Sequence, residues 1–392
     1  MTNKDKKTVI SNGTIITPFQ ILEDKAIDIG GGKIIDIEDE KNMDIPVETE
    51  VIDAAGRFVV PGFIDVHVHG GGGSDTMDGK YEAIKQIANT HCRFGTTAFL
   101  PTTMTMSRDK IIESLKSVNE AFAKGTGTAE ILGVHLEGPY INSERKGAQR
   151  EEDIKNPSIE EFIEFNQAAG NLIRLVTIAP EIPGAMEFIR WLSEHKIIAS
   201  VGHSSATYEK VQESIRAGLN HVTHTFNAMR GLDHREPGVV GAALSSPELM
   251  TQIIADGIHV LPVVIKILIL TKGIENVVLM TDAIRAASMP EGKYDLGGQE
   301  VTVTRGQARL KDGTLAGSIL TMDKAVRNLV TKVGVSLPGS IQMASFNPAK
   351  CLGVEDRKGS LKPGKDADIV ILNKELKVEL TMVKGEVVYR KE

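Results

Sequence analysis

The stretch VVPGFIDVHVHGGGG, from Val59 to Gly73, decides how the rest of the chain is interpreted. It begins with β-branched and aromatic residues, which favour a buried strand. It ends with His67 and His69, followed by four glycines. Residues two apart on a strand point to the same side, so both imidazoles face one way. The pair therefore predicts a metal site at the end of this strand.

Downstream of this stretch, apolar segments alternate with amphipathic helical stretches. That alternation is typical of βαβ units around a parallel sheet. Eight such units over about 270 residues match the size of a (β/α)8 barrel, so we predict an α/β fold with a TIM-like barrel. The predicted strands are Phe58–His69, Thr96–Thr102, Glu130–Glu137, Ile173–Pro180, Ile197–His203, His221–Asn227, Thr251–His259 and Asn276–Asp282.

The two ends of the chain have a different pattern. Residues 1–57 and 360–392 alternate polar and apolar side chains around glycine-rich turns, which is typical of short antiparallel strands. We predict that they form one small β-sandwich domain built from both termini, and that residues 58–359 form the barrel domain. The segment KYDLGGQEVTVTRGQARLKDG, residues 293–313, predicts an inserted hairpin after the eighth barrel strand.

The composition is that of an ordinary soluble enzyme, with 41% hydrophobic and 25% charged residues. The net charge of -7 argues against nucleic acid or an anionic membrane as the main partner, so an anionic substrate needs a local cluster of basic residues. The longest apolar run, VLPVVIKILIL, is interrupted by Lys266 and is too short to span a bilayer.

The expected location is the cytoplasm. Cys92 and Cys351 are the only cysteines, which excludes a disulfide framework and favours a reducing compartment. The N-terminal MTNKDKKTVI has positive charges but no apolar core after them, so it does not predict a signal peptide.

Polar residues stand at or near the ends of several other predicted strands. In a barrel these ends converge on one mouth, where such enzymes place their chemistry. A carboxylate such as Glu137 can bridge two ions through its two oxygens. Imidazole with carboxylate suits Zn²⁺ or Fe²⁺ better than Mg²⁺ or Ca²⁺, which prefer oxygen ligands. The residues are Glu137, His203, His224, His259 and Asp282.

Several other features allow more than one interpretation. His221 lies three residues before His224 on the same predicted strand, so the two face opposite sides and we favour His224 as the inward one. His135 can support the metal site or simply pack in the core. Gly70–Gly73 could form a phosphate loop, but no Lys-Ser/Thr follows, which favours a tight turn beside the metal. The GHSS motif lacks the G-x-S-x-G elbow of serine hydrolases.

Motifs along nearly the whole chain resemble the N-acetylglucosamine-6-phosphate deacetylases of the amidohydrolase superfamily. PGFIDVHVHG is typical of the superfamily, whereas HLEGP, THTFNAM with REPG, and LAGS with TMD are specific to the deacetylases. GHSSAT, ADGIHV, LMTDA and GSLKPGKDADIVIL extend the resemblance toward the C-terminus.

The resemblance implies roles for individual residues. Glu137, His203 and His224 would be metal ligands common to the family, and the retained pair His67 and His69 resembles the two-metal members. Asp282 would be the catalytic proton shuttle and can also contact metal. The implied substrate-binding residues are Ala148, Gln149, Asn227, Ala228, Arg235, His259, Leu315, Ala316 and Gly317.

Two of these residues carry further expectations. Some members have histidine at the position of Gln149, where it polarises the substrate carbonyl, and an amide stands there in this chain. Arg235 resembles a residue that reaches the active site of a neighbouring subunit, which implies a homodimer or homotetramer. The alternative for Arg235 is a surface ion pair with Glu236.

The implied reaction is removal of the acetyl group from N-acetyl-D-glucosamine 6-phosphate, in amino-sugar catabolism or cell-wall recycling. It would depend on one or two divalent ions, Zn or Fe, per subunit. Asp282 would take a proton from the attacking water and deliver it to the departing amine. The alternatives are another amidohydrolase, such as a cyclic-amide hydrolase or a deaminase, and an inactive barrel that serves as a scaffold.

Overall fold

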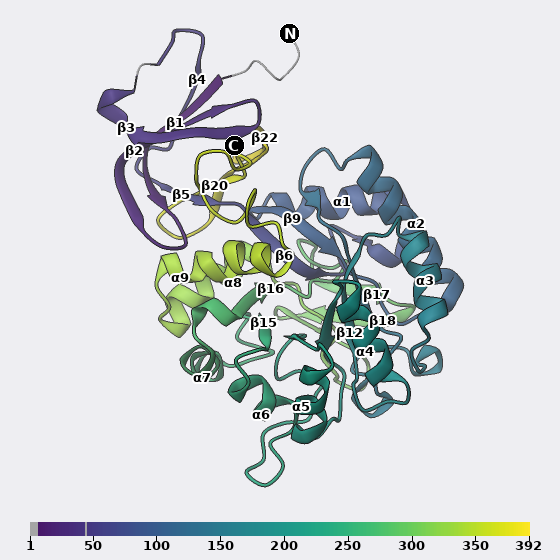
Figure 1. Cartoon of the computed structure of the whole chain (residues 1–392). Coiled ribbons are helices and arrows are strands. Elements are labelled where there is room, and N and C mark those ends of the chain that lie inside the picture. Colours follow the sequence, from purple (N-terminus) through teal and green to yellow (C-terminus); the bar gives the residue numbers. More distant parts are fainter. Residues whose placement is uncertain (1–6, 44) are drawn as a thin grey trace.

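The computed structural model describes residues 7–43 and 45–392 and has a mixed α/β architecture (Figure 1). Residues 1–6 and Asp44 lie outside the described residues. The expectation about a signal peptide, and parts of the predicted terminal domain, fall on those positions.

Both ends of the chain contribute to one sheet of eight strands, at the upper left of Figure 1. Its order is β22-β21-β20-β5-β1-β2-β3, and β4 pairs with β1 beside β5. The strands are β1 (Lys7–Ile16), β2 (Ile21–Gly30), β3 (Lys33–Asp39), β4 (Glu50–Asp53), β5 (Phe58–Pro61), β20 (Ile369–Leu372), β21 (Val378–Val383) and β22 (Glu386–Arg390).

The terminal sheet differs from a simple sandwich because its hydrogen bonding is continuous through all eight strands. An isolated bridge between Lys33 and Asp366 joins the start of β3 to the segment before β20, so the sheet curls back on itself. Alternating isoleucines from both ends, such as Ile27 of β2 and Ile369 of β20, pack into one core. The alternating pattern of the sequence puts these side chains on the buried face.

A network of ion pairs connects the terminal sheet to the rest of the molecule. The buried Lys358 ammonium lies 2.7 Å from Glu130 and 2.5 Å from Asp368. Asp366 is shared by Lys358 at 3.2 Å and Lys33 at 2.6 Å. Glu130 belongs to β10 (Glu130–Ile131), outside the terminal sheet, so the network crosses from one sheet to the other.

Eight parallel strand segments follow one another in a cyclic order. One run of pairings joins β11 through β16, and a second joins β6, β9 and β10. Isolated parallel bridges from Thr102 to His135 and from Val68 to Ala283 connect the two runs at both ends. The segments are β6 (Phe63–Val68), β9 (Thr96–Pro101), β11 (Val134–Glu137), β12 (Ile173–Ile178), β13 (Ile198–Val201), β14 (His221–Val222), β15 (Met250–Ile254) and β16 (Val277–Met280).

Helices lie around the outside of these strands (Figure 1). In the predicted stretch AMEFIRWLSEH, the helix α4 buries Ala185, Phe188, Ile189 and Leu192, which recur at the spacing of one helical face. The helices are α1 (Tyr81–Cys92), α2 (Arg108–Lys124), α3 (Ile159–Ala168), α4 (Ala185–Glu194), α5 (Tyr208–Arg216), α6 (Gly238–Ser245), α7 (Pro262–Lys272), α8 (Met322–Asn328), α9 (Leu337–Ile341) and α10 (Asn347–Cys351).

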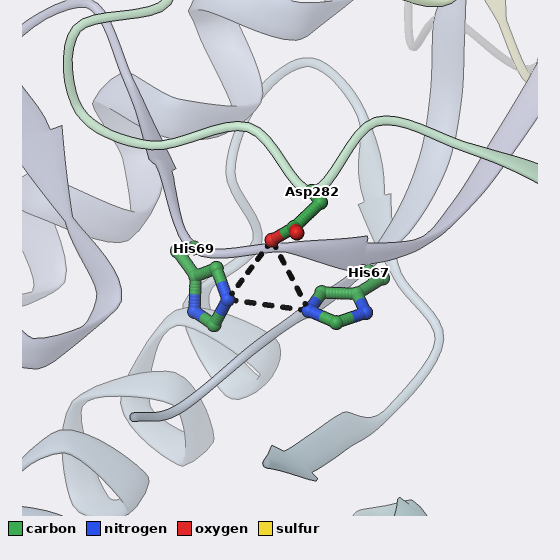
Figure 2. Close-up of side chains that lie close together, drawn as sticks. All are labelled: His67, His69 and Asp282. Atoms are coloured by element: carbon green, nitrogen blue, oxygen red, sulfur yellow. Dashed lines mark hydrogen bonds and ion pairs between the residues drawn. The ribbon is translucent and has the colours of Figure 1, made fainter. Parts of the chain in front are cut away.

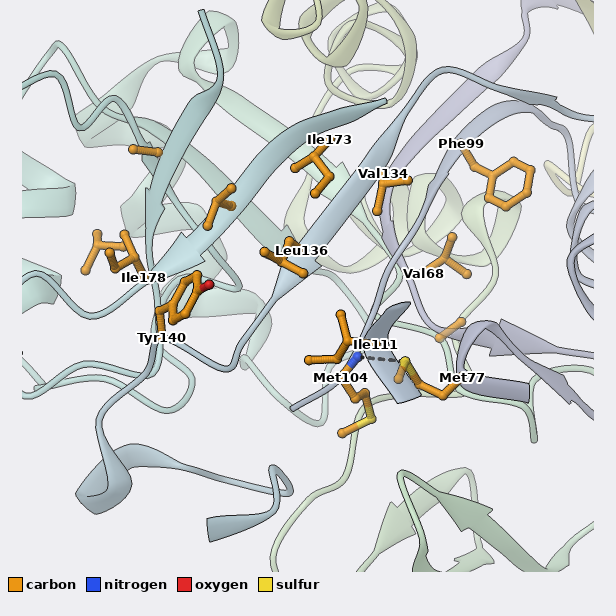
Figure 3. Close-up of a cluster of buried hydrophobic side chains, with 14 of the residues drawn as sticks. Val68, Met77, Phe99, Met104, Ile111, Val134, Leu136, Tyr140, Ile173 and Ile178 are labelled. Atoms are coloured by element: carbon orange, nitrogen blue, oxygen red, sulfur yellow. Dashed lines mark hydrogen bonds between the residues drawn. The ribbon is translucent and has the colours of Figure 1, made fainter. Parts of the chain in front are cut away.

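The inner strands and the helices share a continuous apolar core. Figure 3 shows one part of it, where Val134 and Leu136 of β11 lie near Ile173 and Ile178 of β12. In β11 the apolar Val134 and Leu136 alternate with His135 and Glu137, so the apolar side chains join the core and the polar ones occupy the other face. The core fixes the strand ends from which the polar residues project.

Several strands are shorter than predicted. β14 ends at Val222 and β15 at Ile254, so His224 and His259 lie in the loops that follow. The prediction that His221 and His224 share one strand is therefore wrong. The backbone turns into the left-handed region at His203, His224 and Asp282, with φ of 49°, 31° and 52°, and no strand can continue through such residues.

Two further expectations can be compared with the structure. The segment 293–313 contains three antiparallel strands, β17 (Gly292–Leu296), β18 (Gln299–Thr304) and β19 (Gln307–Arg309). The glycines after His69 form a tight hairpin of β7 (Gly70–Gly71) and β8 (Ser74–Asp75). Over the described ranges, the structure has no helix of the length and apolarity needed to cross a bilayer.

Candidate active site

A cavity of about 310 Å³ is lined by residues that follow the carboxyl ends of the parallel strands. His67 and Ala316 are buried and do not line it, and Arg235 is exposed on a loop. The predicted site residues in its lining are His69, Glu137, Ala148, Gln149, His203, His224, Asn227, Ala228, His259, Asp282, Leu315 and Gly317. The structure thus gathers most of the predicted residues in one pocket.

The first group of possible metal ligands contains His67, His69 and Asp282. Figure 2 shows these three side chains converging. The Nε2 atoms of His67 and His69 are 3.2 Å apart. Oδ1 of Asp282 lies 3.4 Å from Nε2 of His67 and 3.3 Å from Nε2 of His69. The main chain aligns the two segments, because the Asp282 N–H donates to the carbonyl of His67 at 2.9 Å.

The second group contains Glu137, His203 and His224. Glu137 Oε1 lies 3.3 Å from Nε2 of His203 and 3.1 Å from Nε2 of His224. The other carboxylate oxygen, Oε2, lies 3.1 Å from Nε2 of His69. Glu137 therefore spans both groups, with Oε1 closest to His224 and Oε2 close to His69.

The tautomers of three histidines follow from their partners. Each Nδ1 lies within hydrogen-bond distance of a backbone carbonyl, which can only accept, so Nδ1 carries the proton and a neutral ring keeps its lone pair on Nε2. The pairs are His69 with Thr102 O at 3.2 Å, His203 with Arg145 O at 2.8 Å, and His224 with Asn227 O at 3.1 Å. All three Nε2 atoms face the carboxylates of the pocket.

The charges of the site are set by burial and by these contacts. Burial raises the pKa of the Glu137 carboxyl, but His67 and the other nearby histidines outweigh it and hold that pKa well below its usual range. For Asp282, burial is again outweighed by His67 and His69, so its pKa is also lowered. Burial holds the pKa of His135 well below its usual range, so that ring is neutral.

The donor set fits a divalent cation. Within each group the candidate ligand atoms lie within 4.8 Å of one another, and each group combines imidazole nitrogens with a carboxylate. Zinc and iron take nitrogen and oxygen ligands of this kind in proteins. The residues present therefore fit the divalent metal that the sequence predicted.

His135 and His221, the two histidines with more than one interpretation in the sequence, lie outside both groups. His135 Nε2 pairs with the Thr177 hydroxyl at 2.7 Å, and its ring packs edge-on against His67 at a centroid distance of 4.5 Å. His221 pairs through Nδ1 with Asn220 and does not line the pocket. His135 thus supports the position of His67 by packing.

Gln149 has a fixed amide orientation. Its Oε1 accepts the N–H of Thr105 at 2.7 Å, so its Nε2 is the atom that donates to Glu137 Oε2 at 2.9 Å. The side chain lines the pocket and holds the Glu137 carboxylate at the same time.

Arg235 makes no contact with the pocket of its own chain. On its exposed loop, the backbone N–H of Arg235 donates to the Asp233 carboxylate at 2.9 Å. The carboxylate of Glu236 lies 4.0 Å from Arg230 instead, and it accepts the N–H groups of Tyr208 and Gly238. The alternative of an ion pair between Arg235 and Glu236 therefore has no contact among the described residues.

Sequence reasoning missed some residues of the site. The Asp256 carboxylate accepts a hydrogen bond from His259 Nδ1 at 2.7 Å. The other ring nitrogen of His259, Nε2, is then left to contact a ligand. Burial raises the pKa of Asp256, but the hydrogen bond from His259 prevails and lowers it. The spacing of ADGIH was the only available signal. Arg145 also lines the pocket and has no periodic signal in the sequence.

Comparisons with known proteins agree on one family. Residues 58–388 match the model of the Amidohydrolase family. The chain is 40% identical over 384 residues to the N-acetylglucosamine-6-phosphate deacetylase of Bacillus subtilis, with 97% of each chain covered. It is 38% identical over 372 residues to the N-acetylgalactosamine-6-phosphate deacetylase of Escherichia coli O157:H7, covering 95% of this chain and 97% of that one.

Among solved structures, the N-acetylglucosamine-6-phosphate deacetylase of Pasteurella multocida superimposes with a TM-score of 0.93. The sequence identity is 33%, and the match covers 98% of this chain and 100% of the other.

Proposed function

The chain belongs to the amidohydrolase family, and from this premise we infer that it is a metal-dependent hydrolase that removes the acetyl group of N-acetyl-D-glucosamine 6-phosphate. The products are D-glucosamine 6-phosphate and acetate. The observation that carries the proposal is the pair of ligand groups joined by Glu137 inside one pocket.

A divalent cation held by these residues supplies two things that amide hydrolysis lacks at neutral pH, an acidified water and a polarised carbonyl. Glu137, His203 and His224 would hold one ion, and His67, His69 and Asp282 a second. We propose zinc or iron, at one or two ions per subunit.

Asp282 would act as the general base and then as the general acid. Its lowered pKa keeps the carboxylate ionised, so it can accept a proton from the attacking water. The same proton is then delivered to the amine, which cannot leave as an anion. The left-handed backbone at Asp282 directs the side chain into the cavity beside His69.

The substrate phosphoryl group would bind at the opposite part of the pocket. Asn227, Ala228 and His259 line it and are the contacts that the motifs imply. Arg235 would complete this subsite in a neighbouring subunit, because its exposed loop lies outside its own pocket. Leu315 and Gly317, with the buried Ala316 between them, would flank the sugar beside Ala148 and Gln149. We therefore propose a homodimer or homotetramer.

The architecture belongs to the same proposal. The cyclic order of parallel strands supports a (β/α)8 barrel within the predicted range 58–359, and the curled terminal sheet supports a second domain from residues 1–57 and 360–392. The boundary lies a few residues later than predicted, because β5 (Phe58–Pro61) pairs with β1 and β20 in the terminal sheet and the parallel strands begin with β6 at Phe63. We also propose a cytoplasmic location and a role in amino-sugar catabolism or cell-wall recycling.

A second candidate substrate is N-acetyl-D-galactosamine 6-phosphate. The 38% identity to the Escherichia coli relative named for that sugar favours testing it. The two sugars differ only at one hydroxyl, so the same metal groups and phosphoryl contacts would serve either one.

Acetate release tests the function. Purified enzyme should release acetate from N-acetyl-D-glucosamine 6-phosphate, lose that activity with a chelator, and regain it when zinc or iron is returned. Parallel assays with the galactosamine isomer and with unphosphorylated N-acetyl-D-glucosamine rank the substrates. If metal-bound enzyme releases acetate from neither sugar phosphate, the proposal is contradicted.

A further inference from the structure

The pocket lining contains more carboxylates than arginine or lysine side chains. It includes the carboxylates of Glu137, Glu144 and Asp282, but among the described residues only one arginine and no lysine. The arginine is Arg145. A phosphoryl dianion entering this pocket needs a cation close by, because charge-assisted hydrogen bonds offset the cost of removing it from water.

The backbone of Arg145 is tied to the metal centre. The residue ends a short 3-10 turn, Ser143–Arg145, and its carbonyl accepts the Nδ1 proton of His203 at 2.8 Å. The position of the Arg145 main chain relative to the reacting centre is therefore fixed. A substitution of the side chain leaves this carbonyl in place.

The side chain of Arg145 is held at one end only. Its Nε donates to the hydroxyl of Ser205 at 3.0 Å, and that hydroxyl donates to Glu144 at 3.3 Å. No ion pair of the guanidinium is found within residues 7–43 and 45–392. The two terminal NH₂ groups, which form the planar fork, thus remain available.

The neighbouring basic residues do not share this property. Lys146 pairs with Glu151 at 2.5 Å, and Arg150 pairs with Glu152 at 2.5 Å. Neither residue lines the pocket. Arg145 is therefore distinguished from adjacent cations both by its place and by its free fork.

Arg145 also lies beside the wall where the phosphoryl group is expected. Ser205 follows Ser204, whose N–H donates to the carbonyl of Ala228 at 3.1 Å. A methyl group built on Gly147 would lie 3.8 Å from Cβ of Ala228. Segments on both sides of the Arg145 side chain thus meet the Ala228 segment.

We propose that Arg145 is the cation of the same chain that binds the substrate phosphoryl group and selects phosphorylated over unphosphorylated sugar. The Nε contact with Ser205 positions the guanidinium plane, and the terminal NH₂ groups donate to two phosphoryl oxygens. This inference rests on the proposed function and adds a specificity-determining residue to it.

The test compares Arg145→Ala, Arg145→Lys and the matched control Lys146→Ala. For Arg145→Ala, kcat/KM on N-acetyl-D-glucosamine 6-phosphate should fall about 10–150-fold, mainly through KM, as expected for loss of a charge-assisted contact. The value for unphosphorylated N-acetyl-D-glucosamine should stay within about twofold. For Arg145→Lys, kcat/KM on the sugar phosphate should lie between the values for wild type and Arg145→Ala, because an ammonium keeps the charge but lacks the paired NH₂ groups of the guanidinium. Lys146→Ala should match wild type on both substrates.

A binding measurement separates this inference from the proposed function. Calorimetry with glucosamine 6-phosphate and metal-free protein should show weaker binding for Arg145→Ala and not for Lys146→Ala. Equal losses on both sugars, or unchanged binding and kinetics, would overturn the role of Arg145. If wild type releases no acetate, the proposed reaction fails, and calorimetry still decides whether Arg145 binds a sugar phosphate.

Discussion

At the scale of single residues, Glu137 is the side chain on which the site depends most. Its two oxygens reach different ligand groups, and Gln149 holds one of them in place. Gln149 is itself anchored by the Thr105 N–H, so rotation of the Glu137 carboxylate would break its hydrogen bond with a fixed donor. The site is therefore preorganised for its ions.

The first prediction concerns Asp282. Asp282→Asn should bind substrate with a KM near that of wild type, but kcat should fall about 10²–10⁴-fold, because an amide cannot accept the proton. Steady-state acetate release gives both constants. Metal analysis of the variant is the control, since Asp282 also belongs to a ligand group. A near wild-type kcat would remove Asp282 from the mechanism.

The second prediction concerns metal content. The double variant His67→Asn, His69→Asn should hold less metal per chain than wild type after metal-replete growth, because the first ligand group loses both imidazoles. Elemental analysis of purified protein measures this. His195→Asn, on the exposed end of α4, is the control and should match wild type. Equal metal in all three proteins would contradict a second ion.

The sequence predicted these ligands for a physical reason. Histidines and carboxylates at the ends of parallel strands must meet, because the barrel geometry brings those ends together. Arg145 and Asp256 escaped prediction because they act from loops, whose course depends on contacts distant in sequence. Ser205, which positions Arg145, is 60 residues away from it in the chain.

At the scale of elements, strand existence was predictable and strand length was not. Apolar runs identified the eight strands, but β14 has two residues where seven were expected. The predicted strand extended past Val222 because the residues that follow are also buried, although the backbone leaves the strand conformation there. Burial and strand conformation leave the same hydrophobic signal in the sequence.

The third prediction concerns the segment between β19 and α8. Gly317 has a φ of 56°, and a Cβ there would lie 2.5 Å from Ile284 Cγ2 and 3.0 Å from the Asp282 carbonyl. Gly317→Ala should lower the free energy of unfolding by about 1–3 kcal/mol and also reduce kcat, because Asp282 must shift. Gly313→Ala has a similar left-handed backbone with open space around it. If both variants behave alike in thermal unfolding and kcat, the clash is not the cause.

At the scale of the whole molecule, the ion-pair network around Lys358 joins the terminal sheet to β10. Burial raises the pKa of Glu130, but Arg357 and Lys358 outweigh it and lower that pKa to about 2. A carboxyl whose pKa is lower in the folded state stabilises the fold above its ordinary pKa of 4.5. That stability is lost as the pH falls from about 4.5 toward about 2.

The fourth prediction follows from this pH window. Glu130→Gln should lower the free energy of unfolding at pH 7 by roughly 1–3 kcal/mol, and the difference from wild type should shrink toward zero near pH 2. Urea unfolding of metal-free protein across this range measures it. Glu120→Gln, which breaks an exposed pair with Lys124, should cost little at any pH. A constant difference between Glu130→Gln and wild type would contradict the assignment.

The fifth prediction concerns the assembly. Arg235→Ala should weaken kcat/KM for the sugar phosphate by about 10–150-fold and leave the unphosphorylated sugar unaffected. Mixed oligomers of Arg235→Ala and Asp282→Asn chains should regain activity, since one site combines an intact Asp282 with Arg235 of its neighbour. If mass spectrometry confirms mixing and activity stays absent, Arg235 does not act across subunits.

The pairing of β5 with β20 has a consequence for synthesis on the ribosome. After β5 emerges, roughly 300 residues must follow before its partner strand is made, which takes about 15–60 s at about 5–20 residues per second. During that time one edge of β5 has unpaired backbone groups, and such an edge is a template for pairing with other chains. The nascent protein is thus exposed to aggregation through most of its translation. A stop codon anywhere before residue 369 would make that exposure permanent.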